Sequence, residues 1–126
     1  MTYGPVDSPG MPKPIGPYSH AVRAGDLLFV AGQPGLDPAT GSVPAGDFEA
    51  EARQAFVNLR TVVEAAGASL ARVVKTTVFL GSTDDIPAMN QLFAEFFPTA
   101  PPARATPIVG LPRGLRISIE AVVFLG

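Results

Sequence analysis

The sequence predicts an α+β fold in which two helices cover one face of a mostly antiparallel sheet. Residues 47–66 and 85–97 carry apolar side chains at steps of three and four, the spacing of amphipathic helices. Around them, short segments rich in Val, Ile, Thr and Phe are separated by Gly and Pro, which is typical of strands and turns. The predicted order is β-β-α-β-α-β-β, and a length of 126 residues suits a single domain, 1–126.

The composition narrows the class of protein. Hydrophobic residues make up 47% of the chain and charged residues 16%, which indicates an ordered globular protein. A net charge of −2 and a pI near 5.2 argue against a dedicated nucleic-acid binder, which normally has a basic domain. No segment approaches the ~20 apolar residues of a membrane span. The start of the chain lacks the apolar core of a signal peptide, so we expect a cytoplasmic protein.

The residue types that the chain lacks restrict its chemistry. It has no cysteine and one histidine, so we expect no disulfide, no thiolate nucleophile and no metal site built from Cys or His clusters. No dinucleotide-binding, phosphate-binding or serine-hydrolase glycine motif occurs. An enzyme of this composition would use Arg, Glu, Asn, Tyr, hydroxyl groups, backbone groups and water, and we expect no cofactor and no metal.

The first half of the chain reads as a hairpin, a loop and a long helix. Residues 1–14 are rich in Pro and Gly and are expected to be irregular. Residues 19–24 and 27–31 predict two strands joined by a Gly-Asp turn, and the second is continuously apolar, so both its faces should be covered. Residues 32–46 are expected to form a loop. Asp47 is a suitable N-cap for the helix that follows.

The second half begins where the first helix ends. Gly67 supplies the left-handed cap that terminates many helices. Residues 73–80 predict a strand. The second helix starts near Asp85, tolerates a proline in its first turn, and stops at Pro98. Two further strands, on either side of the turn at residues 110–114, are expected to close the sheet as a hairpin.

Arg104 and Glu120 are the most informative residues of this closing hairpin, because each is a charge within an apolar strand. In a hairpin centred on Pro112 they would lie opposite each other, with Cβ atoms about 5 Å apart. One interpretation is a cross-strand ion pair that fixes the register. The other is a small site in which Arg104 grips an anionic substrate and Glu120 handles a proton or a water molecule.

The last strand also predicts self-association. Its odd positions from Leu115 to Leu125 are all apolar and suit the helix layer, whereas its even positions turn from polar to apolar towards Phe124. Residues 27–31 likewise have no polar face. Because an uncovered apolar sheet face marks an interaction surface, we expect a homo-oligomer with cyclic symmetry and a site in a cleft between chains.

Four other residues, Tyr18, Asn90, Thr106 and His20, are polar or aromatic side chains for which a structural role is weighed against a functional one. Tyr18 follows a Gly-Pro turn, and the commonest role of a tyrosine is to pack its ring against neighbouring side chains. Asn90 is placed on the buried-facing stripe of the second helix, where bonding to the neighbouring strand backbone would satisfy it. Thr106 shares a face with Arg104 in a regular strand. His20 is expected to be structural or on the surface.

Five short motifs occur in order along the chain: Ile15–Val22 (IGPYSHAV), Val30–Gln33 (VAGQ), Val74–Phe79 (VKTTVF), Pro102–Arg104 (PAR) and Ile119–Ala121 (IEA). Together they resemble the RidA family of reactive-intermediate deaminases, over a match that runs from about residue 16 to the C-terminus. The resemblance implies a chorismate-mutase-like fold, a homotrimer and active sites between subunits. It also implies hydrolysis of 2-aminoacrylate, 2-iminobutanoate and 2-iminopropanoate to 2-oxo acids and ammonia.

By position, Arg104 resembles the family's carboxylate-binding arginine and Glu120 its water-handling glutamate. Tyr18 and Asn90 resemble pocket residues, and Gly32 the glycine that lines the pocket floor.

The chain departs from the family pattern beside these residues. Ala31 stands where a serine is common and Thr106 where a cysteine is common, and the segment from Arg104 to the turn is one residue shorter than in many relatives. These departures motivate an alternative, a trimer that binds a small metabolite or regulates without turnover. A ribonuclease or translation-inhibitor role has been attached to relatives, but RNA cleavage usually uses histidines or a basic groove, which this acidic chain does not offer.

Overall fold

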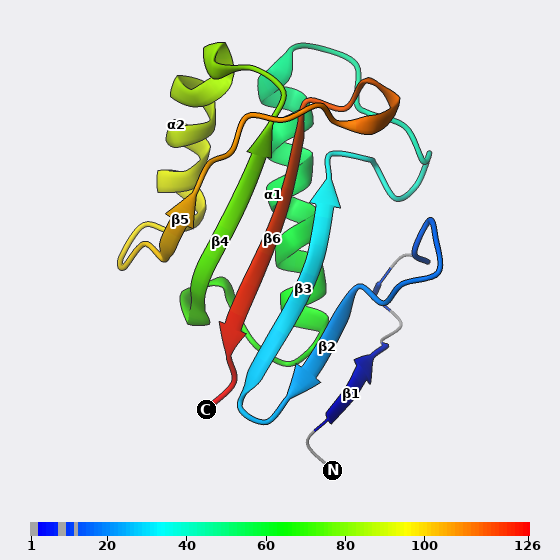
Figure 1. Cartoon of the computed structure of the whole chain (residues 1–126), viewed down its shortest axis with the longest axis vertical. Coiled ribbons are helices and arrows are strands. Elements are labelled where there is room, and N and C mark those ends of the chain that lie inside the picture. The colour runs from blue at the N-terminus through cyan, green and yellow to red at the C-terminus, as the bar shows by residue number, and fades with distance from the viewer. Residues whose placement is uncertain (1–2, 8–9, 12) are drawn as a thin grey trace.

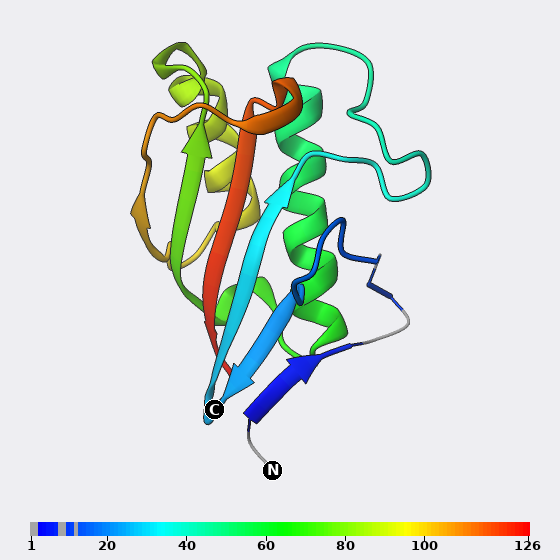
Figure 2. The same cartoon turned by 45° about the vertical axis from the view of Figure 1, so that its right-hand side comes forward.

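The computed structural model describes residues 3–7, 10–11 and 13–126. One six-stranded sheet carries both helices on a single face (Figure 1), and a turned view shows the two layers (Figure 2). The strand order is β1-β2-β3-β6-β4-β5, in which only the β4–β5 pair is parallel. The elements are β1 Tyr3–Val6, β2 Ala21–Ala24, β3 Leu27–Pro34, α1 Phe48–Ala65, β4 Val73–Leu80, α2 Ile86–Phe96, β5 Ala103–Ala105 and β6 Ile117–Phe124.

The helix predictions are confirmed. The Asp47 carboxylate accepts a hydrogen bond from the backbone N–H of Ala50 at 3.2 Å, as an N-cap does. Gly67 has φ +87°, the left-handed conformation that ends α1. α2 begins directly after Asp85 with Pro87 in its first turn. Apolar side chains of both helices pack against the sheet, and the odd positions of β6 from Ile117 to Val123 are buried beneath them.

The predicted closing hairpin is wrong. β6 lies between β3 and β4 and is antiparallel to both, whereas β5 pairs in parallel with the outer side of β4. β6 has one fully apolar row and a second that is half apolar, so a central place buries it best. β5 is three residues long and is followed by Pro107, which cannot donate to a ladder, so β5 suits an edge.

The N-terminal segment is more ordered than expected. Tyr3–Val6 forms an edge strand antiparallel to β2, so the expectation of an irregular segment over residues 1–14 is wrong for this part. Pro5 is tolerated there because an edge strand has an unpaired side. Residues 1–2, 8–9 and 12 lie outside the described residues. β2 begins two residues later than predicted and β3 continues to Pro34.

A buried carboxylate joins α1 to the start of β6. Glu51 is 1% exposed, and its two oxygens accept hydrogen bonds from the side-chain Nε and the backbone N–H of Arg116, each at 2.7 Å. Gly35 packs so closely here that a Cβ would collide with the Glu51 carbonyl oxygen. The pKa of Asp85 nearby is raised because burial disfavours its charge, and Arg116 partly opposes this rise.

Among the described residues, neither helix has the length and hydropathy needed to span a membrane.

We expect Glu51→Ala to lower the free energy of unfolding by about 2–3 kcal/mol, because the Arg116 backbone N–H loses its carboxylate acceptor and a cavity opens. Urea unfolding followed by circular dichroism measures the change. Glu49→Ala is the matched control on the same helix, since Glu49 is exposed and pairs with Arg53 at the surface. Its cost should stay within about 0.5 kcal/mol. Equal costs for the two variants would contradict the importance of the buried contact.

Candidate functional site

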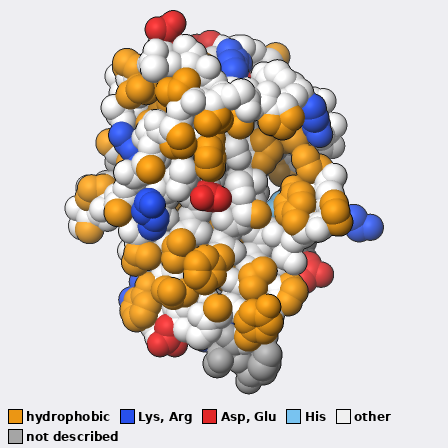
Figure 3. Space-filling view, in the orientation of Figure 1, with side chains coloured by type: hydrophobic (Ala, Val, Ile, Leu, Met, Phe, Trp, Pro, Cys, Tyr) orange, Lys and Arg blue, Asp and Glu red, His pale blue; other side chains and the backbone are white. Residues whose placement is uncertain are grey.

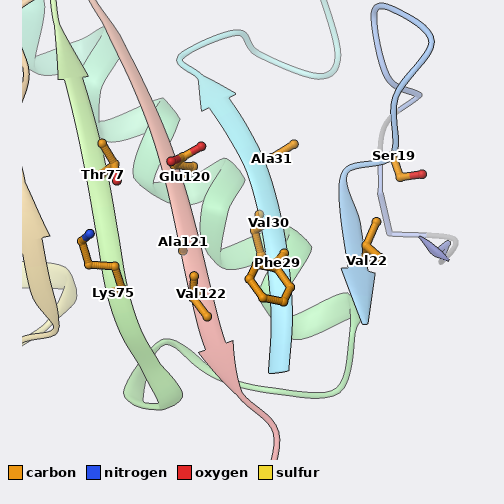
Figure 4. A pocket seen from close by; sticks show the side chains of 10 residues that line it. All are labelled: Ser19, Val22, Phe29, Val30, Ala31, Lys75, Thr77, Glu120, Ala121 and Val122. Atoms are coloured by element: carbon orange, nitrogen blue, oxygen red, sulfur yellow. The ribbon is translucent and has the colours of Figure 1, made fainter. Parts of the chain in front are cut away.

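The open face of the sheet contains a hollow of about 410 Å³ centred on β6. Figure 4 shows Glu120 between Thr77 on β4 and Ala31 on β3, with Lys75 two residues before Thr77 on β4. Glu120 is exposed, and its register partner across the ladder is Thr77. Among the described residues, no cationic nitrogen lies within 4 Å of its carboxylate. The carboxylate is therefore free to bind a ligand or a water molecule.

A β-bulge on β3 faces Glu120. Val30 pairs with Ala121 and Gln33 with Ile119, so two residues, 31 and 32, oppose the single residue Glu120. Such bulges bend a strand and redirect its side chains, and they are common beside active sites. The predicted loop over residues 32–46 is therefore wrong at its start, where β3 continues through this bulge to Pro34.

Gly32 in the bulge is required by a close approach. An ideal Cβ at this position would lie 2.7 Å from the hydroxyl oxygen of Ser118 on β6, closer than real Cβ atoms come. The backbone of β3 therefore lies directly against β6 next to Glu120. The role of Gly32 as part of a pocket floor stays a prediction.

Arg104 lies at the opposite edge of the sheet, on β5. Its register partner is Thr76, which is buried beneath the helices, whereas the next residue of β4 pairs with Glu120 on the open face. Because successive residues of a strand face opposite sides, the side chains of Arg104 and Glu120 leave the sheet on opposite faces, and β4 lies between the two strands that carry them. The interpretation as a cross-strand ion pair is therefore wrong.

The guanidinium of Arg104 is held by α2. It lies 4.8 Å from the ring centroid of Phe93, and its Nη1 donates to the sulfur of Met89 at 3.7 Å. A cation over an aromatic face is attracted by the ring quadrupole without using its N–H groups. Among the described residues, no carboxylate lies within 4 Å of this guanidinium. Most of its hydrogen-bonding capacity remains available.

Asn90 does not occupy the buried stripe of α2. It is exposed, while Met89, Leu92 and Phe93 form the buried side. One residue corresponds to about 100° around a helix, which carries Asn90 out of the stripe that its neighbour Met89 occupies. Since Met89 and Phe93 both contact Arg104, Asn90 lies on the same turn of α2 as those contacts. Thr106, half-buried, directly follows β5.

Tyr18 lies near the other end of the sheet, just before β2. Its side chain is 42% exposed and packs edge to face against His20, with ring centroids 6.1 Å apart. β2 and β5 are separated by four inter-strand steps, or about 19 Å. One chain thus presents two groups of predicted site residues. Tyr18, Ala31, Gly32 and Glu120 lie on the side of β2, β3 and β6, where Ala31 and Glu120 border the open-face hollow, and Asn90, Arg104 and Thr106 lie on the side of α2 and β5.

The described residues contain no group of three or more acidic or histidine side chains placed to hold a metal ion.

The fold and this arrangement define a class: a small α+β protein with helices on one sheet face and an acidic group on the other, open face. The family model described as Endoribonuclease L-PSP matches residues 9–125. The chain belongs to this family, which is also the RidA family.

Individual relatives support this family membership. A RutC family protein of Pyrococcus horikoshii is 46% identical over 90% of each chain. A protein of Dermatophagoides farinae named 2-iminobutanoate/2-iminopropanoate deaminase is 40% identical over 95% of this chain and 94% of its own. The crystal structure of RidA from an Antarctic Psychrobacter has a TM-score of 0.90 and 36% identity, and covers 96% of this chain and 98% of that one. The similarity extends over nearly the whole chain.

We expect Gly32→Ala to lower the free energy of unfolding by about 1–3 kcal/mol, because the added methyl group overlaps the Ser118 hydroxyl. Ser118→Ala removes that oxygen, so the same glycine substitution should cost less than half as much in this background. Chemical denaturation of the four proteins of the double-mutant cycle measures the coupling. An unchanged cost in the Ser118→Ala background would show that the close approach does not explain the glycine.

Proposed function

We propose that this protein is a cytoplasmic imine deaminase that hydrolyses 2-aminoacrylate, 2-iminobutanoate and 2-iminopropanoate to 2-oxo acids and ammonia. The observation that carries the proposal is the Arg104 guanidinium, which is held by an aromatic face and has no carboxylate partner among the described residues. The relative named 2-iminobutanoate/2-iminopropanoate deaminase, at 40% identity, supports the same reaction.

Arg104 would bind the carboxylate of the substrate. The guanidinium fork matches a carboxylate in a bidentate way, and each charge-assisted hydrogen bond contributes about 1.5–3 kcal/mol. Phe93 and Met89 hold the cation in place before the substrate arrives, so less side-chain entropy is lost on binding. Anchoring the carboxylate fixes the position of the adjacent C=N bond.

Glu120 would handle the water. An enamine first tautomerises to the imine, whose carbon is electrophilic. Glu120 accepts a proton from the attacking water as the water oxygen bonds to that carbon, and passes this proton to the imine nitrogen, which becomes an amine. In the resulting carbinolamine the same carboxylate carries the hydroxyl proton to the amine, so that the C–N bond breaks, ammonia leaves and the C=O bond of the 2-oxo acid forms. Since imines hydrolyse spontaneously, orientation of substrate and water supplies much of the needed acceleration.

The two groups of site residues require two copies of the chain. The open face exposes large apolar side chains, as Figure 3 shows, among them Phe29 at 46% and Phe124 at 40%. Burial of apolar surface contributes roughly 25 cal/mol per Å², so a second copy on this face is favourable. We propose a homotrimer in which the open face of one subunit, with Tyr18 and Glu120, meets the Arg104 edge of the next.

Non-catalytic binding of a small metabolite is the alternative, favoured by Ala31 and Thr106 at positions where serine and cysteine are common in the family. Cleavage of RNA remains disfavoured by the pI near 5.2.

The wild-type protein should lower the yield of semicarbazone when 2-iminobutanoate is generated by an amino-acid oxidase in the presence of semicarbazide. Arg104→Ala should reduce this competition by at least about tenfold, because two charge-assisted hydrogen bonds to the carboxylate are lost. The rate of semicarbazone formation, followed by absorbance, measures the effect.

Arg53→Ala is the control for loss of an arginine, since Arg53 pairs with Glu49 and Glu95 on the helix surface. It should match wild type. Undiminished trapping with the wild-type protein, combined with saturable binding of a 2-oxo acid, would favour the non-catalytic alternative. Full activity in Arg104→Ala would remove the proposed anchor.

Phe29→Asp should convert the trimer to monomers, because it places a charge in the middle of the apolar open face. Light scattering coupled to size exclusion measures the mass. Ala94→Asp, which adds the same charge to an exposed position of α2, should leave the trimer intact. A trimer that survives Phe29→Asp, or a monomeric wild type, would disprove assembly through this face.

A further inference from the structure

Thr77 faces Glu120 across the ladder between β4 and β6. The two residues are register partners on antiparallel strands, and both side chains line the open-face hollow (Figure 4). Residues directly opposed in this way have Cβ atoms about 4.5–5.5 Å apart. On the other side of Glu120, the bulge of β3 presents Ala31 and Gly32, neither of which has a polar side-chain group. Thr77 is therefore the polar neighbour of this carboxylate across the sheet.

The chain itself does not use the hydroxyl of Thr77. Among the described residues, the hydroxyls of Thr61 and Thr76 donate to backbone carbonyl oxygens at 3.0 and 3.4 Å, whereas that of Thr77 makes no hydrogen bond. Thr76 is buried beneath the helices, but Thr77 is half-buried at the hollow. A hydroxyl in this position is available to a water molecule or a ligand.

A single water molecule has the size to join the two side chains. No direct hydrogen bond connects Thr77 and Glu120 among the described residues. One water can bridge two oxygen atoms that lie up to about 5.5 Å apart, twice the usual O–H···O distance. This span matches the spacing of directly opposed side chains.

The chemistry of attack requires a second acceptor beside the base. A water oxygen that directs a lone pair at an imine carbon must place both of its O–H groups on acceptors elsewhere. The Glu120 carboxylate accepts one of them as the proposed base. The hydroxyl oxygen of a threonine has lone pairs that can accept the other.

Other polar residues of the hollow suit this role less well. Lys75 lies opposite Val122, and an ammonium group only donates, so it would compete for the lone pair that attacks. Ser19 precedes β2, which is two inter-strand steps from β6, or about 10 Å. Thr77 combines an accepting oxygen with a place next to Glu120.

We propose that Thr77 binds the attacking water together with Glu120. Its Oγ1 accepts one O–H of the water, Glu120 accepts the other, and the water oxygen is directed at the carbon of the C=N bond. No proton passes to Thr77, since Glu120 takes the proton and returns it to the nitrogen. The inference rests on the proposed function and adds a second residue that holds the water, without any contact between Thr77 and the substrate carboxylate.

Thr77→Val removes the hydroxyl and keeps the size and branching of the side chain. In the semicarbazide competition assay with 2-iminobutanoate, the rate should fall about three- to tenfold, the effect of one lost hydrogen bond. Thr77→Ser restores a hydroxyl and should recover most of the rate. Thr61→Val is the matched control, because it removes a half-buried hydroxyl of α1 on the helix layer, and it should match wild type.

Calorimetric titration with 2-oxobutanoate, the product, separates binding from chemistry. Thr77→Val should bind it as wild type does, whereas Arg104→Ala should bind it more weakly. Three results would overturn the inference: an undiminished rate in Thr77→Val, an equal loss of rate in Thr77→Ser, or a loss of 2-oxobutanoate affinity in Thr77→Val that accounts for its loss of rate. A wild-type protein without turnover would remove the proposed function and this inference together, whereas an active wild type matched by Thr77→Val would remove the inference alone.

Discussion

The structure depends on the insertion of β6 between β3 and β4. A central strand has two paired edges, and its alternate residues face two different environments. One row, from Ile117 to Val123, is buried beneath the helices and forms the middle of the core. The other row places Glu120 on a face that no element of the described chain covers. The core and the candidate site are thus the two sides of one strand, and the Glu51–Arg116 contact fixes where that strand begins.

The sheet keeps its two informative charges apart. An ion pair within the chain would satisfy both groups and leave neither for a ligand. Here Thr76 and Thr77, consecutive residues of β4, pair with Arg104 and Glu120 respectively, so the two charges point to opposite faces. Arg104 is stabilised by the Phe93 ring, a neutral partner that leaves its N–H groups unused. The proposed site, which uses both charges, would therefore draw them from different copies of the chain.

Sequence patterns correctly predicted those features of the fold that depend on residues close together along the chain. Asp47 and Gly67 bound α1 as expected because a cap is a local interaction, and the alternation of β6 separated core from open face correctly. Strand neighbours depend on contacts between distant segments, so the local hairpin rule placed β5 and β6 together wrongly. The bulge at Gly32 was missed for a similar reason, because a bulge is defined by its pairing with the partner strand. The Ser118 hydroxyl, which leaves room only for a glycine at position 32, lies 86 positions away in a strand whose register the sequence does not give.

The bulge also joins β3 to the segment before β2. The Ala31 side chain lines the open-face hollow near Glu120, while the Ala31 carbonyl accepts a hydrogen bond from Gln33. The same Gln33 nitrogen lies 3.1 Å from Nδ1 of the His20 ring. One buried side chain, Gln33, thus contacts both the bulge beside Glu120 and the His20 ring.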